Sequence, residues 1–256
     1  MKKLINKFTN LVQLENYLKK SYDLLLHREI AEKRSNHINP LNKFSVFSGF
    51  AQSDEDGITL EILRRIGLNF GYFVEFGVGD GTENNSLILL ACNWKGAWFG
   101  GQELTFDTSC SDKLNFEKVW ISKDNILSLY NSLNESADVI SLDLDGNDIY
   151  LVEELLSNKV QPKLFIVEYN AKFPPPIEFK IDYNPTHTWV GDDYFGASLK
   201  SFNNLFSSYG YRLVCCNLSG ANAFFVASEY AHLFDDVPKD IEDIYCEPFY
   251  FLRSKR

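Results

Sequence analysis

Short apolar runs alternate with longer amphipathic stretches along the chain from residue 72 onward. The apolar runs predict seven strands, at 72–76, 97–100, 118–121, 138–142, 163–168, 211–216 and 223–227. The amphipathic stretches predict helices at 84–92, 125–133, 149–157 and 195–208, after an earlier helix that starts at Ser53 and closes near Gly67. Uninterrupted apolar strands separated by helices are typical of a sheet buried on both faces, hence mostly parallel.

The last two predicted strands are joined only by a short turn of six residues, 217–222, which begins Asn217-Leu218-Ser219-Gly220. A parallel crossover needs a dozen residues or more, so these strands must form an antiparallel hairpin. The predicted fold class is therefore α/β, a Rossmann-like sandwich whose seven-stranded, mostly parallel sheet ends in a C-terminal antiparallel hairpin.

The first 50 residues form a separate pattern. Their apolar side chains recur at helical spacing, at Leu4, Phe8, Leu11, Val12, Tyr17, Leu18, Tyr22 and Leu25. We expect residues 1–50 to be an N-terminal helical extension and residues 51–256 to be one ligand-binding domain. The extension would pack on its own domain or on a second copy of the chain, in a homodimer, in preference to a membrane surface.

Composition narrows the partners and the compartment. A formal net charge of −10 disfavours binding to nucleic acid, whose phosphates attract basic surfaces. The five cysteines form no C-x-x-C pair, which is typical of reduced thiols in the cytoplasm. No apolar run approaches the roughly 20 residues of a membrane span. We therefore expect a cytoplasmic protein that acts on a small molecule.

A glycine loop follows the first predicted strand. Its glycines, Gly77-x-Gly79-x-Gly81, come after an acid, Glu75, and before a helix. Glycines let the backbone turn sharply and let a ligand lie against it. The spacing is one residue shorter than the dinucleotide fingerprint, and no Walker lysine follows. The loop predicts a nucleotide-like cofactor of another kind.

The sequence E-x-G-x-G-x-G resembles motif I of class I S-adenosylmethionine-dependent methyltransferases, whose sheet also ends in a hairpin. Between about Gln52 and about Val226, further motifs look like those of the FkbM-like group, associated with bacterial capsule and O-antigen gene clusters. These motifs are Asp54-Glu55-Asp56-Gly57-Ile58, Asp143-x-Asp145-Gly146, Glu168-Tyr169-Asn170 and Tyr194-Phe195-Gly196-Ala197-Ser198-Leu199.

The resemblance implies an O-methyltransferase for a sugar hydroxyl, on a nucleotide-linked sugar destined for a surface polysaccharide. It implies S-adenosylmethionine contacts from Glu75, Gly77, Gly79, Gly81, Thr82, Gln102, Glu103, Asp124 and Asp143. Glu103, or Gln102 as a neutral substitute, would bind the ribose hydroxyls. Asp124 would lie near the adenine.

Two acidic clusters follow neighbouring strands. Asp143 and Asp145 follow the fourth strand, and Glu168 and Asn170 end or follow the fifth. Ligands of such sheets sit beyond the carboxyl ends of the strands, so both clusters should face the crevice of the glycine loop. Oxygen ligands of this kind suit Mg²⁺ or Mn²⁺, with Asp143, Glu168 and Asn170 as the expected ligands. The alternative is that the carboxylates grip substrate hydroxyls directly.

A sugar hydroxyl is a weak nucleophile and needs a base or a cation that lowers its pKa. Asp145, Asp143 or His187 would serve as that base. His187 lies in a long proline-containing segment, 172–193, which we interpret as a lid over the acceptor. The expected substrate contacts are Asp145, Trp189, Tyr194 and Asn222.

Two other classes of protein remain as alternatives. The Asp143-x-Asp145 pair also matches the pattern with which metal-dependent glycosyltransferases hold a sugar nucleotide, but this reading leaves the glycine loop and the hairpin unexplained. A noncatalytic protein that keeps the fold as a partner module is the third reading.

Overall fold

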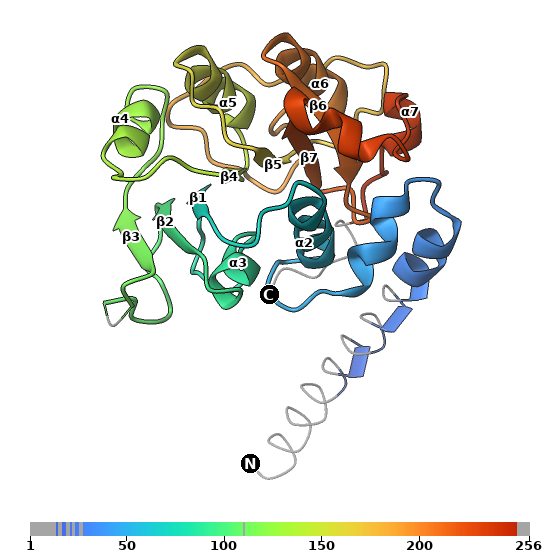
Figure 1. The fold of residues 1–256 in the computed structure, drawn as a ribbon, viewed down its shortest axis with the longest axis horizontal. Helices are drawn as coiled ribbons and strands as arrows, with labels where there is room; N and C mark the ends of the chain where they lie inside the picture. The colour runs from blue at the N-terminus through green and yellow to red at the C-terminus, as the bar shows by residue number, and fades with distance from the viewer. Residues whose placement is uncertain are drawn as a thin grey trace, which may run out of the picture.

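The computed structural model describes residues 14, 17–18, 21, 24–25, 28–109 and 111–249. Its centre is one seven-stranded sheet with the order β3-β2-β1-β4-β5-β7-β6 (Figure 1). The strands are β1 Tyr72–Phe76, β2 Lys95–Gly100, β3 Leu114–Lys118, β4 Val139–Leu142, β5 Leu164–Glu168, β6 Tyr211–Cys216 and β7 Asn222–Ala227. The α/β fold class is confirmed.

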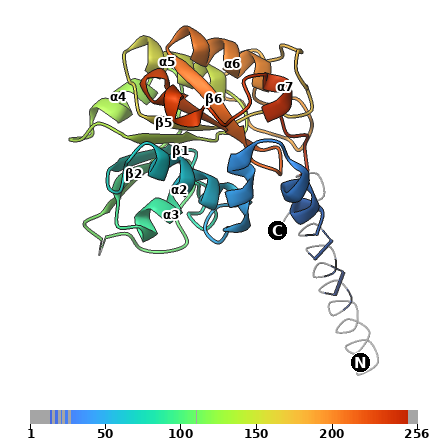
Figure 2. The ribbon, with the colours of Figure 1, turned by 45° about the vertical axis from the view of Figure 1, so that its right-hand side comes forward.

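Helices cover both faces of the sheet. On one face lie α4 (Ile126–Asn131), α5 (Asp148–Ser157) and α6 (Leu199–Ser208), and on the other lie α2 (Glu55–Arg65) and α3 (Leu87–Ala91) (Figures 1 and 2). Every residue of β1 and of β4 is buried, because both faces of these central strands pack against helices. The remaining elements are short: 3-10 helices η1 (Pro40–Val46) and η2 (Ser228–Phe234), and α7 (Ile241–Ile244).

The C-terminal hairpin enters the sheet with β7 inside and β6 at the edge. β7 pairs antiparallel with both β5 and β6, while the other neighbouring strands run parallel. In this register Glu168 at the end of β5 lies opposite Asn222 at the start of β7. The predicted hairpin is therefore confirmed.

Two predicted boundaries are wrong. The third strand is Leu114–Lys118, four residues earlier than expected, because β3 is an edge strand that pairs only with β2 and is buried at Leu114 alone. The more apolar run after Lys118 leaves the sheet. Helix α6 starts at Leu199, since the Ser198 side chain caps it by accepting from the Ser201 N–H.

The N-terminal extension is described only in part. Residues 28–36 are helical, and most of the earlier residues of the expected amphipathic helix lie outside the described part of the chain. The connector that follows is fastened to β6: Asn39 Nδ2 donates to Val214 O at 2.8 Å, and Asn42 Nδ2 donates to Cys216 O at 2.9 Å. Within the described residues, no helix has both the length and the apolar character of a membrane span.

Candidate active site

The glycine loop lies where β1 meets β4. Gly77 has φ +96°, and a Cβ added there would lie 1.6 Å from the carbonyl oxygen of Asp143. Only glycine allows the ends of the two strands to approach this closely. Gly81 also has a positive φ, +86°, and faces Leu104 and Phe106. A Cβ added at Gly79 would meet no atom within 4 Å, so there is open space beside the centre of the loop.

Glu75 fixes the exit of this loop. Its Oε1 accepts from the Asn85 N–H and its Oε2 from the Ser86 N–H, both at 3.0 Å, and the Ser86 hydroxyl also donates to Oε2. Trp98 Nε1 donates to that hydroxyl at 2.7 Å. Desolvation by burial raises the pKa of Glu75, although these hydrogen bonds oppose the rise. The observed role of the acid is to hold the start of α3.

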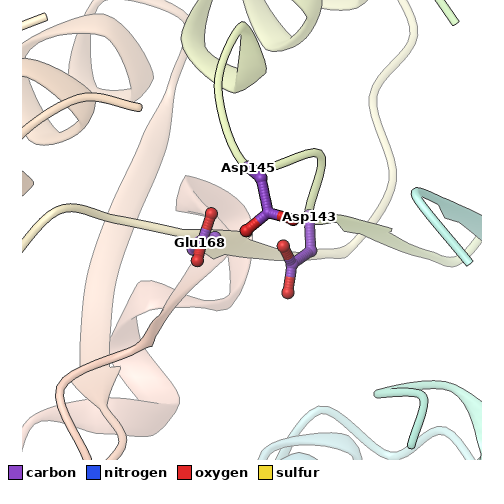
Figure 3. A group of neighbouring side chains, drawn as sticks. All are labelled: Asp143, Asp145 and Glu168. Atoms are coloured by element: carbon purple, nitrogen blue, oxygen red, sulfur yellow. The ribbon is translucent and has the colours of Figure 1, made fainter. Parts of the chain in front are cut away.

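Three carboxylates converge at the ends of β4 and β5. Figure 3 shows the side chains of Asp143 and Asp145, from the loop after β4, and of Glu168, at the end of β5, close to one another. One oxygen from each lies within 4.8 Å of those of the other two. Asp145 adopts a left-handed backbone, with φ +55°, immediately before Gly146. The structure thus brings together three of the predicted acidic residues.

The cluster is electrostatically unfavourable by itself. Desolvation raises the pKa of Asp143 well above its usual value, and the charges of Asp145, Asp148 and nearby glutamates raise it further. Desolvation and the charge of Asp143 do the same for Glu168. The Oε2 atom of Glu168 is buried and has no hydrogen-bond partner among the described residues. Such a group needs protons or a cation, and its oxygens are ligands that Mg²⁺ or Mn²⁺ prefers.

Asp148 holds the loop that carries Asp145. Its two carboxylate oxygens accept from the backbone N–H groups of Leu144 at 2.8 Å and Gly146 at 2.9 Å, at the start of α5. Desolvation raises the pKa of Asp148 to about 6. The fourth acid of this region is therefore a structural cap for the acidic loop.

His187 reaches the same loop from the 172–193 segment. Its ring lies against Gly146, and its buried Nε2 has no hydrogen-bond partner in the described part of the chain. Desolvation raises the pKa of Asp145, and the nearby His187 opposes this rise. Asn147 and Asn184 hold the segment in place, with Asn147 Nδ2 donating to Asn184 O at 2.7 Å and Asn184 N–H donating to Asn147 Oδ1 at 3.2 Å. The base candidates His187 and Asp145 are thus neighbours.

Asn170 has a different task from the one expected. Its Nδ2 donates to the carbonyl oxygens of Asp193 and Phe195, both at 2.9 Å, and its Oδ1 accepts from the Lys172 N–H at 3.1 Å. These bonds tie the two ends of the 172–193 segment to the end of β5. Asn170 therefore bonds to this segment and lies outside the group of carboxylates that could hold a cation, which consists of Asp143, Asp145 and Glu168.

The expected sugar contacts Trp189, within this segment, and Tyr194, just after it, are partly exposed. Trp189 is 41% exposed and donates from Nε1 to Asp192 O at 2.7 Å. Tyr194 is 50% exposed, and its hydroxyl accepts from the Asp182 N–H at 3.3 Å. Both side chains are thus partly exposed, while their rings make edge-on contacts with Phe195 and Phe179.

The expected adenosine contacts lie at the ends of β2 and β3. Gln102, Glu103 and Asp124 are all exposed. Glu103 also forms an ion pair of 2.7 Å with Lys118. Thr82 donates to Asp80 Oδ1, which orders the turn after the glycines. The segment after Glu103 contacts the same turn, since the Thr105 N–H donates to Asp80 O at 2.9 Å.

A buried polar layer next to the site escaped the sequence analysis. Glu55 Oε1 accepts from Asn217 Nδ2 at 2.6 Å and from Asn222 Nδ2 at 3.0 Å, and Asp54 Oδ2 accepts from the Leu218 N–H at 2.8 Å. Asn222 is only 5% exposed, so its side chain belongs to this layer, and we remove it from the substrate contacts. The acidic motif Asp54-Glu55-Asp56 was the available signal, but the partners of Asp54 and Glu55 at residues 217–222 lie more than 160 residues away.

No protein-family model and no curated protein matches the sequence. Among solved structures, it is similar to the MycE methyltransferase from the mycinamycin biosynthetic pathway in complex with Mg, SAH and mycinamycin VI, with 15% identity, 73% of this chain and 54% of that chain covered, and a TM-score of 0.43. It is also similar to CalO1, a methyltransferase in calicheamicin biosynthesis in its SAH-bound form, with 17% identity, 65% and 52% covered, and a TM-score of 0.38.

A third similar structure is an O-methyltransferase family 2 protein from Planctomyces limnophilus in complex with apigenin, with 14% identity, 81% of this chain and 62% of that chain covered, and a TM-score of 0.38. The chain thus spans between 52% and 62% of the length of these three proteins. Similarities this weak carry no argument about the site.

Proposed function

We propose that this protein is an S-adenosylmethionine-dependent O-methyltransferase whose acceptor is a sugar hydroxyl. The observation that carries the proposal is the contact between the glycine loop and the carboxylate cluster, in which Gly77 lies against the carbonyl of Asp143. A loop suited to a nucleotide-like donor and a cluster suited to a polar acceptor therefore share one edge of the sheet.

The donor would lie along the glycine loop. Its amino-acid part would occupy the open space at Gly79, between Gly77 and Gly81, with Thr82 at the end of the turn. The resemblance to motif I supports this orientation, which directs the adenosine toward Gln102 or Glu103 and Asp124. Glu75 contributes by holding the loop exit.

Asp143, Asp145 and Glu168 would hold a divalent cation, Mg²⁺ or Mn²⁺. Their mutual distances and the unpartnered Oε2 of Glu168 support this ligand set. When bound, such a cation supplies a positive charge that lowers the pKa of an acceptor hydroxyl and fixes its orientation.

The chain's own residues would align the acceptor and remove its proton. A sulfonium methyl group is already activated, so catalysis mainly requires an acceptor oxygen in line with it and the exclusion of water. His187, whose Nε2 is buried beside the acidic loop, or Asp145 would take the proton from the hydroxyl. The exposed rings of Trp189 and Tyr194 would pack on a sugar face.

The finer parts of the proposal come from the FkbM-like resemblance. They are a nucleotide-linked sugar as acceptor, a role in capsular or other surface polysaccharide biosynthesis, and a cytoplasmic location. The net charge of −10 supports a small-molecule substrate over a nucleic acid. A homodimer formed through the N-terminal extension belongs to the same proposal.

Calorimetry with S-adenosylhomocysteine tests the donor, and mass spectrometry of nucleotide sugars incubated with enzyme and S-adenosylmethionine, with and without EDTA, tests the acceptor and the cation. We expect saturable binding and a product 14 mass units heavier. Binding of a sugar nucleotide without any binding of either sulfur compound would favour the glycosyltransferase alternative.

A further inference from the structure

Trp120 lies near Gly101, which precedes the residues expected to contact the adenosine, Gln102 and Glu103. It follows β3, where the Val119 N–H donates to Gly100 O at 2.8 Å and so keeps the chain beside the end of β2. A Cβ added at Gly101 would lie 3.7 Å from Cε3 of the indole ring, and 53% of Trp120 is exposed. An exposed tryptophan at this position presents a flat apolar face beside Gly101, the residue before Gln102 and Glu103.

The same indole is hydrogen-bonded to the lid segment. Trp120 Nε1 donates to the carbonyl oxygen of Pro185 at 2.8 Å, across 65 residues of sequence. A second contact lies beside it, since the Lys123 N–H donates to the Tyr183 hydroxyl at 3.1 Å. Two independent hydrogen bonds therefore connect residues 183–185 to residues 120–123, on the donor side of the site.

Residues 120–125 are themselves held in place by internal hydrogen bonds. Asn125 Nδ2 donates to Trp120 O, and Asn125 Oδ1 accepts from the Ser122 N–H, both at 2.8 Å. Tyr183 is also supported on its other side, by an edge-on contact with Tyr150. The tryptophan backbone is thus fixed, while its ring joins a rigid turn to a long loop.

His187 lies two residues after Pro185, so the bond from Trp120 acts close to the base candidate. On the acidic side the loop is held by Asn147, which bonds to Asn184. The position of His187 against Gly146 therefore depends on anchors from both the donor side and the acid side. Loss of the donor-side anchor would leave the imidazole held from one side only.

We infer that Trp120 is a positioning residue that couples occupation of the donor side to the order of the lid and of His187. A ligand that packs on the indole face restrains the ring and so strengthens the hold on Pro185. If the donor, by ordering the lid, increases the affinity for the acceptor by some factor, thermodynamic reciprocity requires that the acceptor increase the affinity for the donor by the same factor. This inference depends on the proposed function, because it needs a donor that lies beside Trp120.

Hydrogen exchange of the full chain, with and without saturating S-adenosylhomocysteine, tests the coupling. We expect that compound to slow amide exchange in residues 181–187 of the wild-type protein by about fivefold, the scale of one net hydrogen bond. Trp120→Phe keeps an aromatic face but removes the N–H donor. It should retain affinity for S-adenosylhomocysteine within about twofold and lose most of the protection.

Trp189→Phe is the matched control, because Trp189 is a similarly exposed indole whose N–H bonds to Asp192 within the segment. It should keep the protection of residues 181–187. Tyr183→Phe removes the second bond and should lose part of the protection, which gives an independent check if Trp120→Phe folds poorly.

The possible failures are distinct. If S-adenosylhomocysteine binds the wild-type protein without protecting residues 181–187, or protects Trp120→Phe equally, the coupling is wrong and the proposed function stands. If the folded wild-type protein does not bind it, the proposed function fails and takes the coupling with it.

Discussion

A Cβ atom at Gly146 would lie 2.4 Å from Cδ2 and 3.1 Å from Nε2 of His187, so the imidazole occupies the space that any larger residue needs. The backbone cannot retreat easily, because the Gly146 N–H donates to Asp148 Oδ2 at 2.9 Å. The glycine of the Asp-x-Asp-Gly motif therefore makes room for a histidine that lies 41 residues later in the printed sequence.

Gly146→Ala should displace the imidazole without removing a carboxylate. If His187 is the base, we expect the rate of methyl transfer to fall by about 10²-fold, the lower range for a lost general base. Affinity for S-adenosylhomocysteine should stay within about twofold, since the glycine loop is untouched. Kinetics with the acceptor found by mass spectrometry, together with calorimetry, measure both quantities.

Gly49→Ala is the control for this change, because a Cβ at Gly49 would meet no atom within 4 Å. It should leave the rate unchanged. An unchanged rate in Gly146→Ala as well would transfer the role of base from His187 to Asp145 or Asp143.

Gly77→Ala should be the most damaging glycine substitution in the donor loop. The new Cβ would overlap the carbonyl of Asp143, at 1.6 Å, in a backbone with φ +96°. We expect a loss of roughly 3 kcal/mol or more in the free energy of unfolding, together with the loss of donor binding. Denaturant unfolding and calorimetry with S-adenosylhomocysteine measure these effects.

Gly67 separates backbone strain from the clash. Its φ is +77°, but a Cβ there meets nothing within 4 Å, and it follows the end of α2. Gly67→Ala should cost only about 1 kcal/mol and leave donor binding intact. Equal costs at the two positions would show that the contact with Asp143 is unimportant.

The central strands were predictable because they are buried on both faces and therefore read as continuous apolar runs. The meeting of Asp143 with Glu168 was predictable for a related reason, since the carboxyl ends of neighbouring parallel strands share one edge. The edge strand β3 was placed too late, because a strand with one neighbour and one buried residue carries almost no pattern.

The bonds of individual polar side chains were not predictable. Glu55 and Asn217 pair across 162 residues, and no local pattern announces that pairing. Asn170 follows β5 as a ligand would, yet its carboxamide closes the base of the lid segment. Where a side chain bonds to loop backbone, its role depends on a loop conformation that periodicity does not encode.

Glu61 predicts a pH dependence of stability away from the site. Desolvation would raise its pKa, but hydrogen bonds from Arg64 at 2.7 Å and Arg65 at 2.9 Å outweigh it and hold the pKa below its usual value. A carboxylate whose pKa is lower in the folded than in the unfolded state stabilises the protein at any pH above its unfolded-state pKa. This stabilisation is lost as the pH falls through the folded-state pKa. Glu61→Gln should therefore cost about 1–2 kcal/mol at pH 7, and progressively less below about pH 4.

Denaturant unfolding of both proteins across this pH range measures the difference. A cost of Glu61→Gln that stays constant down to pH 3 would contradict an origin in the carboxylate charge.

Glu168→Gln should distinguish the contribution of Glu168 to cation binding from its contribution to the stability of the cation-free protein. In the wild-type protein, Mg²⁺ or Mn²⁺ should raise the melting temperature, because it binds the folded cluster and neutralises repelling carboxylates. The gain should increase with pH, since burial raises the pKa of Asp143 and Glu168 and protons then compete with the cation at low pH. Glu168→Gln should lose most of this gain.

The same substitution should stabilise the protein in EDTA, by about 1 kcal/mol, because it removes a buried charge whose Oε2 has no partner among the described residues. Glu117→Gln, at an exposed carboxylate on β3, should change neither quantity. A cation that stabilises Glu168→Gln as much as the wild type would exclude Glu168 as a ligand. Destabilisation of Glu168→Gln in EDTA would contradict the expectation that the buried charge of Glu168 disfavours the folded state.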